Sequence, residues 1–331
     1  MRTHGVFVSS IGPVIERYVA LKRALGRRFE TQEYLLTQLD RFLVSSHAPD
    51  LSVESFAAWC SSIEHVTAGA RRQRMRAVYH LCLFRRRSEP TCFVPNPSQF
   101  PPPQPRPRPH IFSEAEISRL LHATEALQPR APSPLHRQVA RLALVLLYTT
   151  GLRRREVVRL TLGDYDATGH LLLVRESKFH KSRLIPLSAD AVIEIERYLQ
   201  DRCRLGFPCD ADSPLLLTRH GGLTAYSDEG FGGLMRKLFR RAGVRTAAGR
   251  PPRVHDLRFT FAVHALLRWY RAGVDVQTRL PALTVYMGHG SIVSTQYYLT
   301  FLDAVAEAAS ERFGQYCSRL LLLDSSAGGG R

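Results

Sequence analysis

Residue types that can hold and attack a phosphate group gather between positions 254 and 299. A histidine and an arginine stand three positions apart, at His255 and Arg258, and a second histidine follows a glycine at His289. A tyrosine lies nine residues further on, at Tyr298. Residues three apart on a helix share one face, so His255 and Arg258 are predicted to project together. Arginine and histidine can bind a phosphate and tyrosine can attack it, so the stretch predicts a phosphate site with its own nucleophile.

The same stretch offers no ligand set for a metal ion. It contains no paired carboxylates, and the six cysteines of the chain show no CxxC spacing and no neighbouring histidine pattern. We therefore expect no metal and no cofactor, and reduced thiols in a cytoplasmic protein. No apolar run is long enough to cross a bilayer and the N-terminus lacks the apolar core of a signal peptide, so no membrane partner is predicted.

The charge of the chain indicates a polyanionic partner. Lysine and arginine number 46 against 29 acidic residues, which gives a net charge of +17. Apolar residues make up 44%, as in a globular protein, and 331 residues suffice for two domains. Charge alone does not separate a DNA-binding protein from one that is merely basic.

The first part of the chain, residues 1–94, reads as all-helical. Apolar residues recur at a helical period over 13–25 and 31–44, Ser52 is a candidate N-cap, and a fourth helix is expected over about 67–86. The first half of that fourth helix carries four arginines that could contact DNA. They are Arg71, Arg72, Arg74 and Arg76. A solvated basic face on an ordinary helix is the alternative interpretation.

Eight prolines between 95 and 109 predict an extended linker at a domain boundary. After it, Ser113 and Glu116 have the spacing of a capping box, and 138–149 reads as a buried helix. Gly151 is expected to end that helix and let another begin, on which Glu156 can hold Arg153 in place.

Two short strands are predicted at about 170–175 and 183–187, and the turn between them carries Lys178 and Lys181. Lys181 is a further candidate contact to DNA. Further helices are expected at 189–204, 229–242 and 302–316, with a short strand at 215–218. The chain is thus predicted to be mainly α with a small β-sheet, an α+β fold, and its last residues, 317–331, form a tail.

Taken in order, these motifs resemble the tyrosine recombinase family, also called phage integrases, over about residues 111–316. Thr150-Gly151-Leu152-Arg153 with Glu156 is similar to the segment of the first catalytic arginine, and Lys178 to the hairpin lysine. His255-Asp256-Leu257-Arg258 is similar to the His-x-x-Arg box, and His289 and Tyr298 to the final histidine and the nucleophile. The gap of 31 residues between Arg258 and His289 is longer than is usual in the family, with the excess at 269–281.

The resemblance implies a site-specific recombinase of the integrase or transposase type, from a mobile element. Its catalytic residues would be Arg153, Lys178, His255, Arg258, His289 and Tyr298, with Glu156 in support. Deprotonating a tyrosine at pH 7 costs about 4 kcal/mol, which a cationic site can partly offset, with His255 as the nearest proton acceptor and Lys178 as the donor to the leaving 5′-oxygen. A 3′-phosphotyrosine would store the bond energy, so neither metal nor ATP is required.

The implied domains are a helical DNA core-binding domain at 1–94, a linker at 95–110 and a catalytic domain at 111–316. Double-stranded DNA is the expected partner, bound by a tetramer on paired sites or with related recombinase subunits. Two other functions fit the same residues: strand relaxation of the type IB topoisomerase kind, and a catalytically silent DNA-binding regulator. The neighbouring Tyr297 is expected to pack inward and Tyr298 to face the phosphate.

Overall fold

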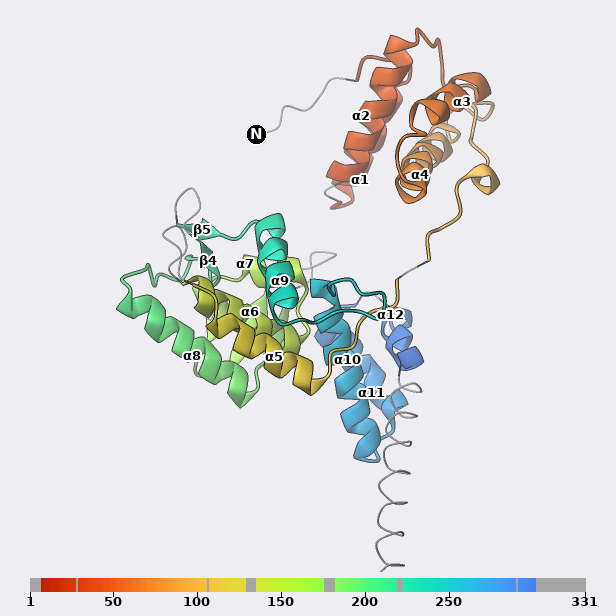
Figure 1. Ribbon diagram of the computed structural model, residues 1–331. Helices are drawn as coiled ribbons and strands as arrows, with labels where there is room; N and C mark the ends of the chain where they lie inside the picture. Colours follow the sequence, from red (N-terminus) through yellow and green to blue (C-terminus); the bar gives the residue numbers. More distant parts are fainter. Residues whose placement is uncertain are drawn as a thin grey trace, which may run out of the picture. The chain divides into compact units, whose positions relative to one another are not determined.

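A computed structural model describes residues 7–27, 29–105, 107–128, 135–175, 182–218, 223–289 and 291–301 (Figure 1). The chain divides into two compact units, at Met1–Pro107 and Arg108–Arg331, which are described separately. Lys178 and Lys181 lie outside the described residues, as do the helix predicted at 302–316 and the tail at 317–331.

The first unit is a helical bundle whose elements begin where the sequence predicts. Ser52 and Thr67 cap the third and fourth helices, and each side chain accepts a backbone N–H three residues on, at 3.2 and 3.4 Å. Trp59, Leu36 and Leu39 lie fully inside the bundle. Its elements are α1 (Gly12–Ala24), α2 (Glu30–Ser45), α3 (Val53–Ser62), α4 (Ala68–Arg85) and the 3₁₀ helix η1 (Pro97–Gln99).

The proline-rich segment is extended along most of its length, but near its start it differs from the predicted extended linker by one short 3₁₀ helix. Asn96 caps η1 by accepting the backbone N–H of Ser98 at 3.0 Å, and Pro97 occupies the first helical position. Proline fits there because the first helical N–H needs no partner within the helix. Phe100 then packs into the core of the first unit.

Most helices of the second unit pack around one large apolar core. The capping box predicted at Ser113 is present, since its hydroxyl accepts from the backbone of Glu116 at 3.2 Å and the Glu116 carboxylate accepts from Ser113 at 2.9 Å. Nearly every apolar side chain of the sixth helix is buried, so it runs through the middle of this core. The helices around this core are α5 (Glu114–Glu125), α6 (His136–Thr150), α7 (Arg154–Arg159), α8 (Ala189–Arg204) and α9 (Asp228–Arg241).

The strands are short and antiparallel. In the larger sheet the order is β1-β2-β3, and Leu172 pairs with Ile185, both with no exposed surface. The predicted strands at 170–175 and 183–187 are confirmed within one residue at each end. Strands β1 and β5 were not predicted, because two residues are too few to show the alternation of a strand. The strands are β1 (Tyr165–Asp166), β2 (Leu171–Val174), β3 (Arg183–Pro186), β4 (Leu217–Thr218) and β5 (Thr224–Ala225), and the 3₁₀ helix η2 (Leu162–Asp164) precedes β1.

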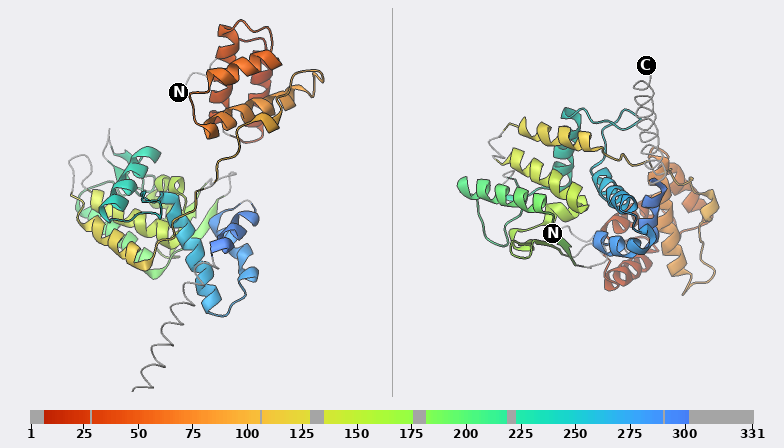
Figure 2. Two further views of the ribbon diagram at one scale, coloured as in Figure 1. Left: turned by 45° about the vertical axis from the view of Figure 1, so that its right-hand side comes forward. Right: turned by 90° about the horizontal axis from the view of Figure 1, so that it is seen from below.

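The last described helices form a smaller group beside this core. Their shared apolar cluster contains Leu266, Leu280, Leu283 and Met287, together with Tyr298. Figures 1 and 2 show the two long helices of the group side by side, with the short final helices against them. The group consists of α10 (Val254–Arg271), α11 (Val276–Met287), α12 (Val293–Gln296) and the 3₁₀ helix η3 (Tyr297–Phe301).

The fold is mainly helical with small sheets, so the predicted α+β class is confirmed. No helix of the described residues is long and apolar enough to cross a membrane.

Candidate active site

Arg258 is the most deeply buried charge of the predicted set, with 1% of its surface exposed. Its helix begins at Val254 because the side chain of Asp256 accepts the backbone N–H of Arg253 at 2.9 Å, so the aspartate of the His-x-x-Arg motif caps the helix. The Arg258 guanidinium donates to the carbonyl of Gly151 at 2.6 Å and to that of Met287. Burial and the charge of Arg153 lower the pKa of Arg258 to about 10, which leaves it protonated at neutral pH.

Glu156 holds two arginines at once. Its carboxylate accepts from Nη1 of Arg153 at 2.7 Å and from Nη1 and Nη2 of Arg183 at 3.1 and 2.9 Å. Arg153 is the N-cap of α7 rather than a residue within it, and its backbone N–H also donates to Glu156, at 2.8 Å. Burial alone would raise the pKa of Glu156, but the bonds and charges of Arg183 and Arg153 outweigh it and lower that pKa to about 2.

Arg183 is a member of the cluster that the sequence analysis did not single out. The chain has 46 lysines and arginines, and nothing in their spacing marks this one. One signal was present: residues two apart on a strand face the same side, and Ile185 of β3 is fully buried. That alternation turns Arg183 inward, and its side chain is only 10% exposed.

Three guanidiniums meet three successive carbonyls at the end of α11. Arg183 donates to the carbonyl of Tyr286 at 2.9 Å, Arg258 to that of Met287, and Arg153 to that of Gly288 at 2.8 Å. The last carbonyls of a helix lack partners within it and carry partial negative charge, so they are suitable acceptors for cations. This contact joins the arginines to the segment that bears His289 and Tyr298.

Gly288 makes this junction possible. It ends α11 in the left-handed region at φ 64°, which residues with a side chain rarely adopt. A Cβ atom there would also lie 2.8 Å from Nη1 of Arg183. The backbone conformation therefore favours glycine before His289, and a side chain there would also displace the Arg183 guanidinium.

Tyr298 lies against His289 inside the small apolar cluster, and Tyr297 does not. The two rings of Tyr298 and His289 stack with centroids 5.8 Å apart, and 3% of Tyr298 is exposed. Tyr297, which was expected to pack inward, is partly buried against Phe259 and Phe301, at centroid distances of 5.9 and 5.4 Å, but it is less deeply buried than Tyr298. Burial raises the pKa of Tyr298, and the positive charge of Arg258 offsets part of that rise.

Both histidines are neutral near pH 7. Removal from water and the guanidiniums around it lower the pKa of His289 to about 3. The surrounding protein and the charge of Arg258 lower the pKa of His255 to about 4, although part of its side chain remains exposed to solvent. A neutral imidazole can accept a proton, and a bound phosphate would raise both pKa values by adding negative charge.

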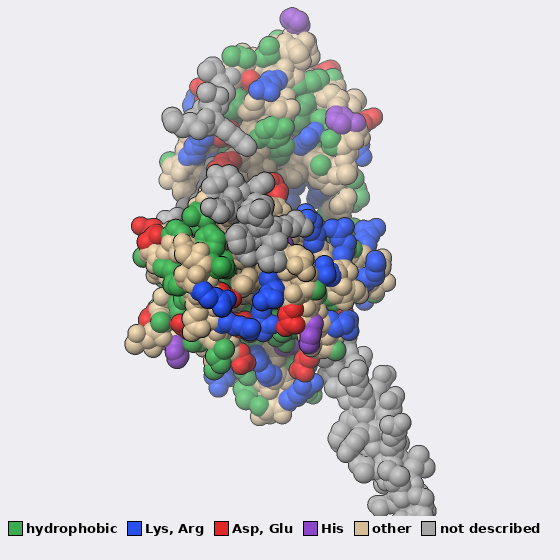
Figure 3. Space-filling view, turned by 60° about the vertical axis from the view of Figure 1, so that its left-hand side comes forward, with side chains coloured by type: hydrophobic (Ala, Val, Ile, Leu, Met, Phe, Trp, Pro, Cys, Tyr) green, Lys and Arg blue, Asp and Glu red, His purple; other side chains and the backbone are tan. Residues whose placement is uncertain are grey.

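The structure therefore brings together Arg153, Glu156, Arg258, His289 and Tyr298, with His255 at the edge of the group. Among the described residues, no three His, Cys, Asp or Glu side chains are arranged to hold a metal ion. Figure 3 shows Lys and Arg side chains gathered on one face of the second unit.

The four arginines predicted to contact DNA lie on α4 of the first unit and differ in environment. Arg76 is exposed, and the other three are half-buried. Arg72 donates to the carbonyl of Pro101 at 2.5 Å and so ties the proline-rich segment to its own unit. Arg76 is thus the arginine of this helix most open to a partner, and Arg72 has a structural bond as well.

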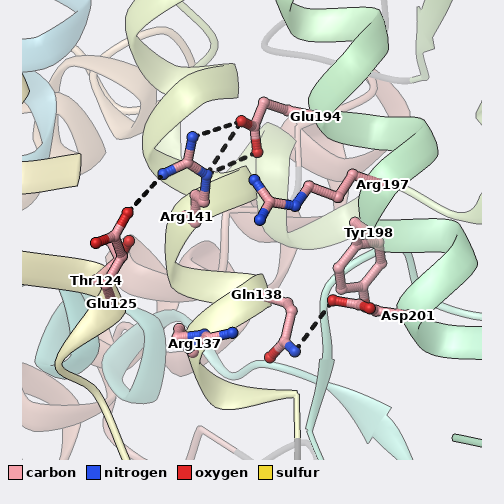
Figure 4. A pocket seen from close by; sticks show the side chains of 9 residues that line it. All are labelled: Thr124, Glu125, Arg137, Gln138, Arg141, Glu194, Arg197, Tyr198 and Asp201. Atoms are coloured by element: carbon pink, nitrogen blue, oxygen red, sulfur yellow. Dashed lines mark hydrogen bonds and ion pairs between the residues drawn. The ribbon is translucent and has the colours of Figure 1, made fainter. Parts of the chain in front are cut away.

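A pocket on the second unit, shown in Figure 4, contains none of the predicted catalytic residues. It lies between α5, α6 and α8. Arg141 and Glu194 pair there through three hydrogen bonds of 2.6 to 3.0 Å, and Gln138 donates to Asp201 at 3.2 Å. Because Arg141 is paired with Glu194 and no predicted catalytic residue lines the pocket, it is not assigned to the phosphate site.

Known proteins resemble the chain along most of its length. The model of the Phage integrase family matches residues 110–304. A Sinorhizobium fredii protein named y4rB, classed as a candidate integrase/recombinase, is 30% identical over 92% of this chain and 97% of its own. Among solved structures, XerH bound to palindromic difH after cleavage shares the fold at 17% identity with a TM-score of 0.63, covering 92% of this chain and 85% of XerH. The integrase of transposon Tn1549 with transposon right-end DNA is similar at 19% identity and a TM-score of 0.59, over 90% of this chain and 98% of its own.

Proposed function

Because the chain belongs to the phage integrase family of tyrosine recombinases, enzymes that cleave and rejoin DNA, we propose that Tyr298 attacks a DNA phosphodiester and becomes linked to its 3′-phosphate. The observation that carries this proposal is the convergence of Arg153, Arg258 and His289 with Tyr298 at the end of α11. Glu156 is the carboxylate that keeps the first arginine in place.

Charge stabilisation is the main task of the site. The non-bridging oxygens of the phosphate gain negative charge as the fifth bond to phosphorus forms, and guanidiniums held in position need not reorganise to stabilise it. Arg153 and Arg258 have the freedom to do so, because each guanidinium has five N–H hydrogens and the carbonyls and Glu156 use only some of them.

The proton transfers balance without a metal ion or ATP. The Oη–phosphorus bond of Tyr298 forms while the bond to the 5′-oxygen breaks, and the phenol proton passes to a base. His255 is neutral and can accept that proton. The 5′-oxygen takes a proton from Lys178 and leaves as a hydroxyl, and the reverse attack by a 5′-hydroxyl of another strand rejoins the DNA.

We assign DNA binding to residues 1–94, linkage to 95–110 and catalysis to 111–316. The +17 charge and the arginines of α4 support a double-stranded DNA partner. A tetramer on two paired sites, in the cytoplasm, and transposition or integration of a mobile element are the finer parts of this proposal. The Tn1549 integrase, whose fold is similar, is in complex with transposon right-end DNA, which fits the mobile-element assignment.

Capture of the covalent product tests the chemistry without knowledge of the target site. The protein is mixed with a library of nicked duplexes of random sequence, and complexes that survive a denaturing gel are recovered. Mass spectrometry of the digested adduct should place the nucleotide on Tyr298. Tyr298→Phe should form no adduct while keeping DNA affinity, and Tyr297→Phe, the matched control, should form it at nearly the wild-type rate.

Two further arms separate the alternatives. Adduct formation should persist in EDTA, and loss with chelator that magnesium restores would contradict the mechanism. Products joined between different duplexes indicate recombination, whereas relaxed supercoiled plasmid without exchanged partners indicates the topoisomerase-like activity. Binding without any adduct on the library would leave the silent regulator as the function.

A further inference from the structure

Thr295 is a fully buried hydroxyl between His289 and α11, and the mechanism above does not use it. Its Oγ1 lies 2.8 Å from Nδ1 of His289 and 2.8 Å from Oγ1 of Thr284. Thr284 in turn lies 2.8 Å from the carbonyl oxygen of Leu280. Two hydroxyls therefore connect the ring of His289 to the backbone of α11 in one continuous chain.

Each hydroxyl has one hydrogen to give, so Thr295 can both donate and accept within this chain in two ways. In the first, Thr284 donates to the carbonyl of Leu280, Thr295 donates to Thr284, and Nδ1–H of His289 donates to Thr295. In the second, Thr284 donates to Thr295, Thr295 donates to a bare Nδ1, and the proton of His289 is on Nε2. The first makes three hydrogen bonds and the second two, so the protein without DNA favours the proton on Nδ1.

A phosphate reverses that preference. Its oxygen accepts a hydrogen bond from Nε2–H, and a bond to a charged acceptor is roughly twice as strong as a neutral one. The second arrangement gains this bond and gives up only the neutral bond to the Leu280 carbonyl. The two threonines can accommodate the change by rotating their hydroxyls, with no movement of the backbone.

We propose that Thr295 is a positioning residue that holds His289 through Nδ1, and that the Thr284–Thr295 hydroxyl pair reverses its direction when a phosphate occupies the site. The proposal rests on the function assigned to His289 above. Thr295 and Tyr298 are three residues apart, and both side chains are buried. The same turn of chain thus fixes the nucleophile and, through one hydroxyl, the histidine beside it.

The test compares Thr295→Val, which keeps the side-chain shape and removes the hydroxyl, with Thr295→Ser, which keeps the hydroxyl. We expect Thr295→Val to slow adduct formation on the nicked library by about tenfold to a hundredfold, below the loss for a direct transition-state donor, with unchanged DNA affinity. Thr295→Ser should stay within about threefold of wild type. Thr278→Val, a change at an exposed threonine in the first turn of α11, is the control for threonine loss.

Nuclear magnetic resonance of histidine-labelled protein reads the tautomer directly, with the His289 signals assigned by their absence in His289→Gln. The free protein should show the proton on Nδ1, and inorganic vanadate, a phosphate mimic, should shift it to Nε2 in wild type and Thr295→Ser. In Thr295→Val the free-protein tautomer should no longer be fixed on Nδ1. The pH dependence of adduct formation should also change in Thr295→Val and not in Thr278→Val.

Equal loss of rate in Thr295→Ser and Thr295→Val would overturn the positioning role, because a hydroxyl would then not matter. A His289 tautomer that is the same with and without vanadate would overturn the reversal. If Thr295→Val proves unfolded, the tautomer measurements on wild type and Thr295→Ser still decide the matter. Absence of any adduct from wild-type protein refutes the proposed function instead, and the tautomer measurement stands apart from it.

Discussion

The two sides of the candidate site are built in different ways. Arg153, Glu156 and Arg183 are positioned by α6, α7 and β3, whose apolar side chains belong to the large core of the second unit. His289 and Tyr298 belong to the segment that packs on a much smaller apolar cluster with α11. Helix α10 contributes to both, with Leu257 in the large core and Leu266 in the small one, and Tyr286 of α11 also packs against both.

This difference shows that the guanidiniums have a structural task besides the chemical one. The large core fixes the arginines, and their bonds to the last carbonyls of α11 then fix the segment that carries the nucleophile. At the end of α11, hydrogen bonds from guanidiniums to carbonyls hold the segment in place, as apolar contacts do in the large core. Changes at the junction should accordingly reduce catalysis before they reduce the stability of the large core.

Of the substitutions at the site, Arg258→Ala should have the largest effect on the rate of adduct formation. It removes a donor to the transition state and leaves the carbonyls of Gly151 and Met287 without their partner. We expect the rate of adduct formation to fall by about 10²–10³-fold or more, and the unfolding temperature to fall as well. Arg268→Ala, in the exposed last turn of the same helix, is the control and should change neither. A catalytically normal Arg258→Ala would remove it from the site.

Glu156→Gln tests the side that rests on the large core. Removing one partner from a buried ion pair typically costs about 3–5 kcal/mol, and here two arginines lose their carboxylate. The pKa of Glu156 is about 2 in the folded protein, below its usual value, so the stabilisation is complete above the unfolded pKa of about 4.3 and is lost as the pH falls toward 2.

Denaturant unfolding at several pH values measures this effect. The difference in free energy of unfolding between wild type and Glu156→Gln should be largest near pH 7 and should shrink between pH 4 and pH 2. A difference that stays constant over that range would mean that the carboxylate is not the stabilising charge. Glu229→Gln, at an exposed acidic residue in the first turn of α9, is the matched control.

Gly288→Ala should give the smallest change in stability, and it should best separate an effect on catalysis from an effect on stability. Gly273→Ala is its control, because both glycines have positive φ, 64° and 68°, and only at Gly288 would a Cβ meet another atom, Nη1 of Arg183 at 2.8 Å. Each variant should lose about 1–2 kcal/mol from the strained backbone. Only Gly288→Ala should also slow adduct formation, by displacing Arg183. Equal rates in the two variants would show that the junction tolerates that displacement.

Much of the fold could be predicted from the sequence because its signals are local. Ser113 with Glu116 indicates a capping box within four residues, and β2 and β3 are short segments on either side of a turn. Helix α11 was not predicted, since Pro281 lies inside it and its buried residues, Leu280, Leu283 and Met287, are few. A proline within a helical pattern normally indicates a break.

The site residues that lie in short sequence motifs could be predicted, whereas those that only the fold brings to the site could not. Arg153, Arg258 and His289 could be named because their neighbours in sequence are distinctive. Arg183 could not, because its contact with Glu156 joins positions 27 residues apart. The carbonyls of Tyr286, Met287 and Gly288 have no side-chain signal at all, since any residue supplies a carbonyl.

The use of backbone carbonyls has a consequence for how the length of this region can vary. Successive residues of a helix point about 100° apart, so one residue inserted within α11 would rotate the carbonyls at its end away from the arginines. The turn at 272–275, before α11 begins, has no such constraint and can absorb added residues. Between Arg258 and His289, the turn at 272–275 is therefore the place where length can vary, whereas the phase of α11 relative to Gly288 is fixed.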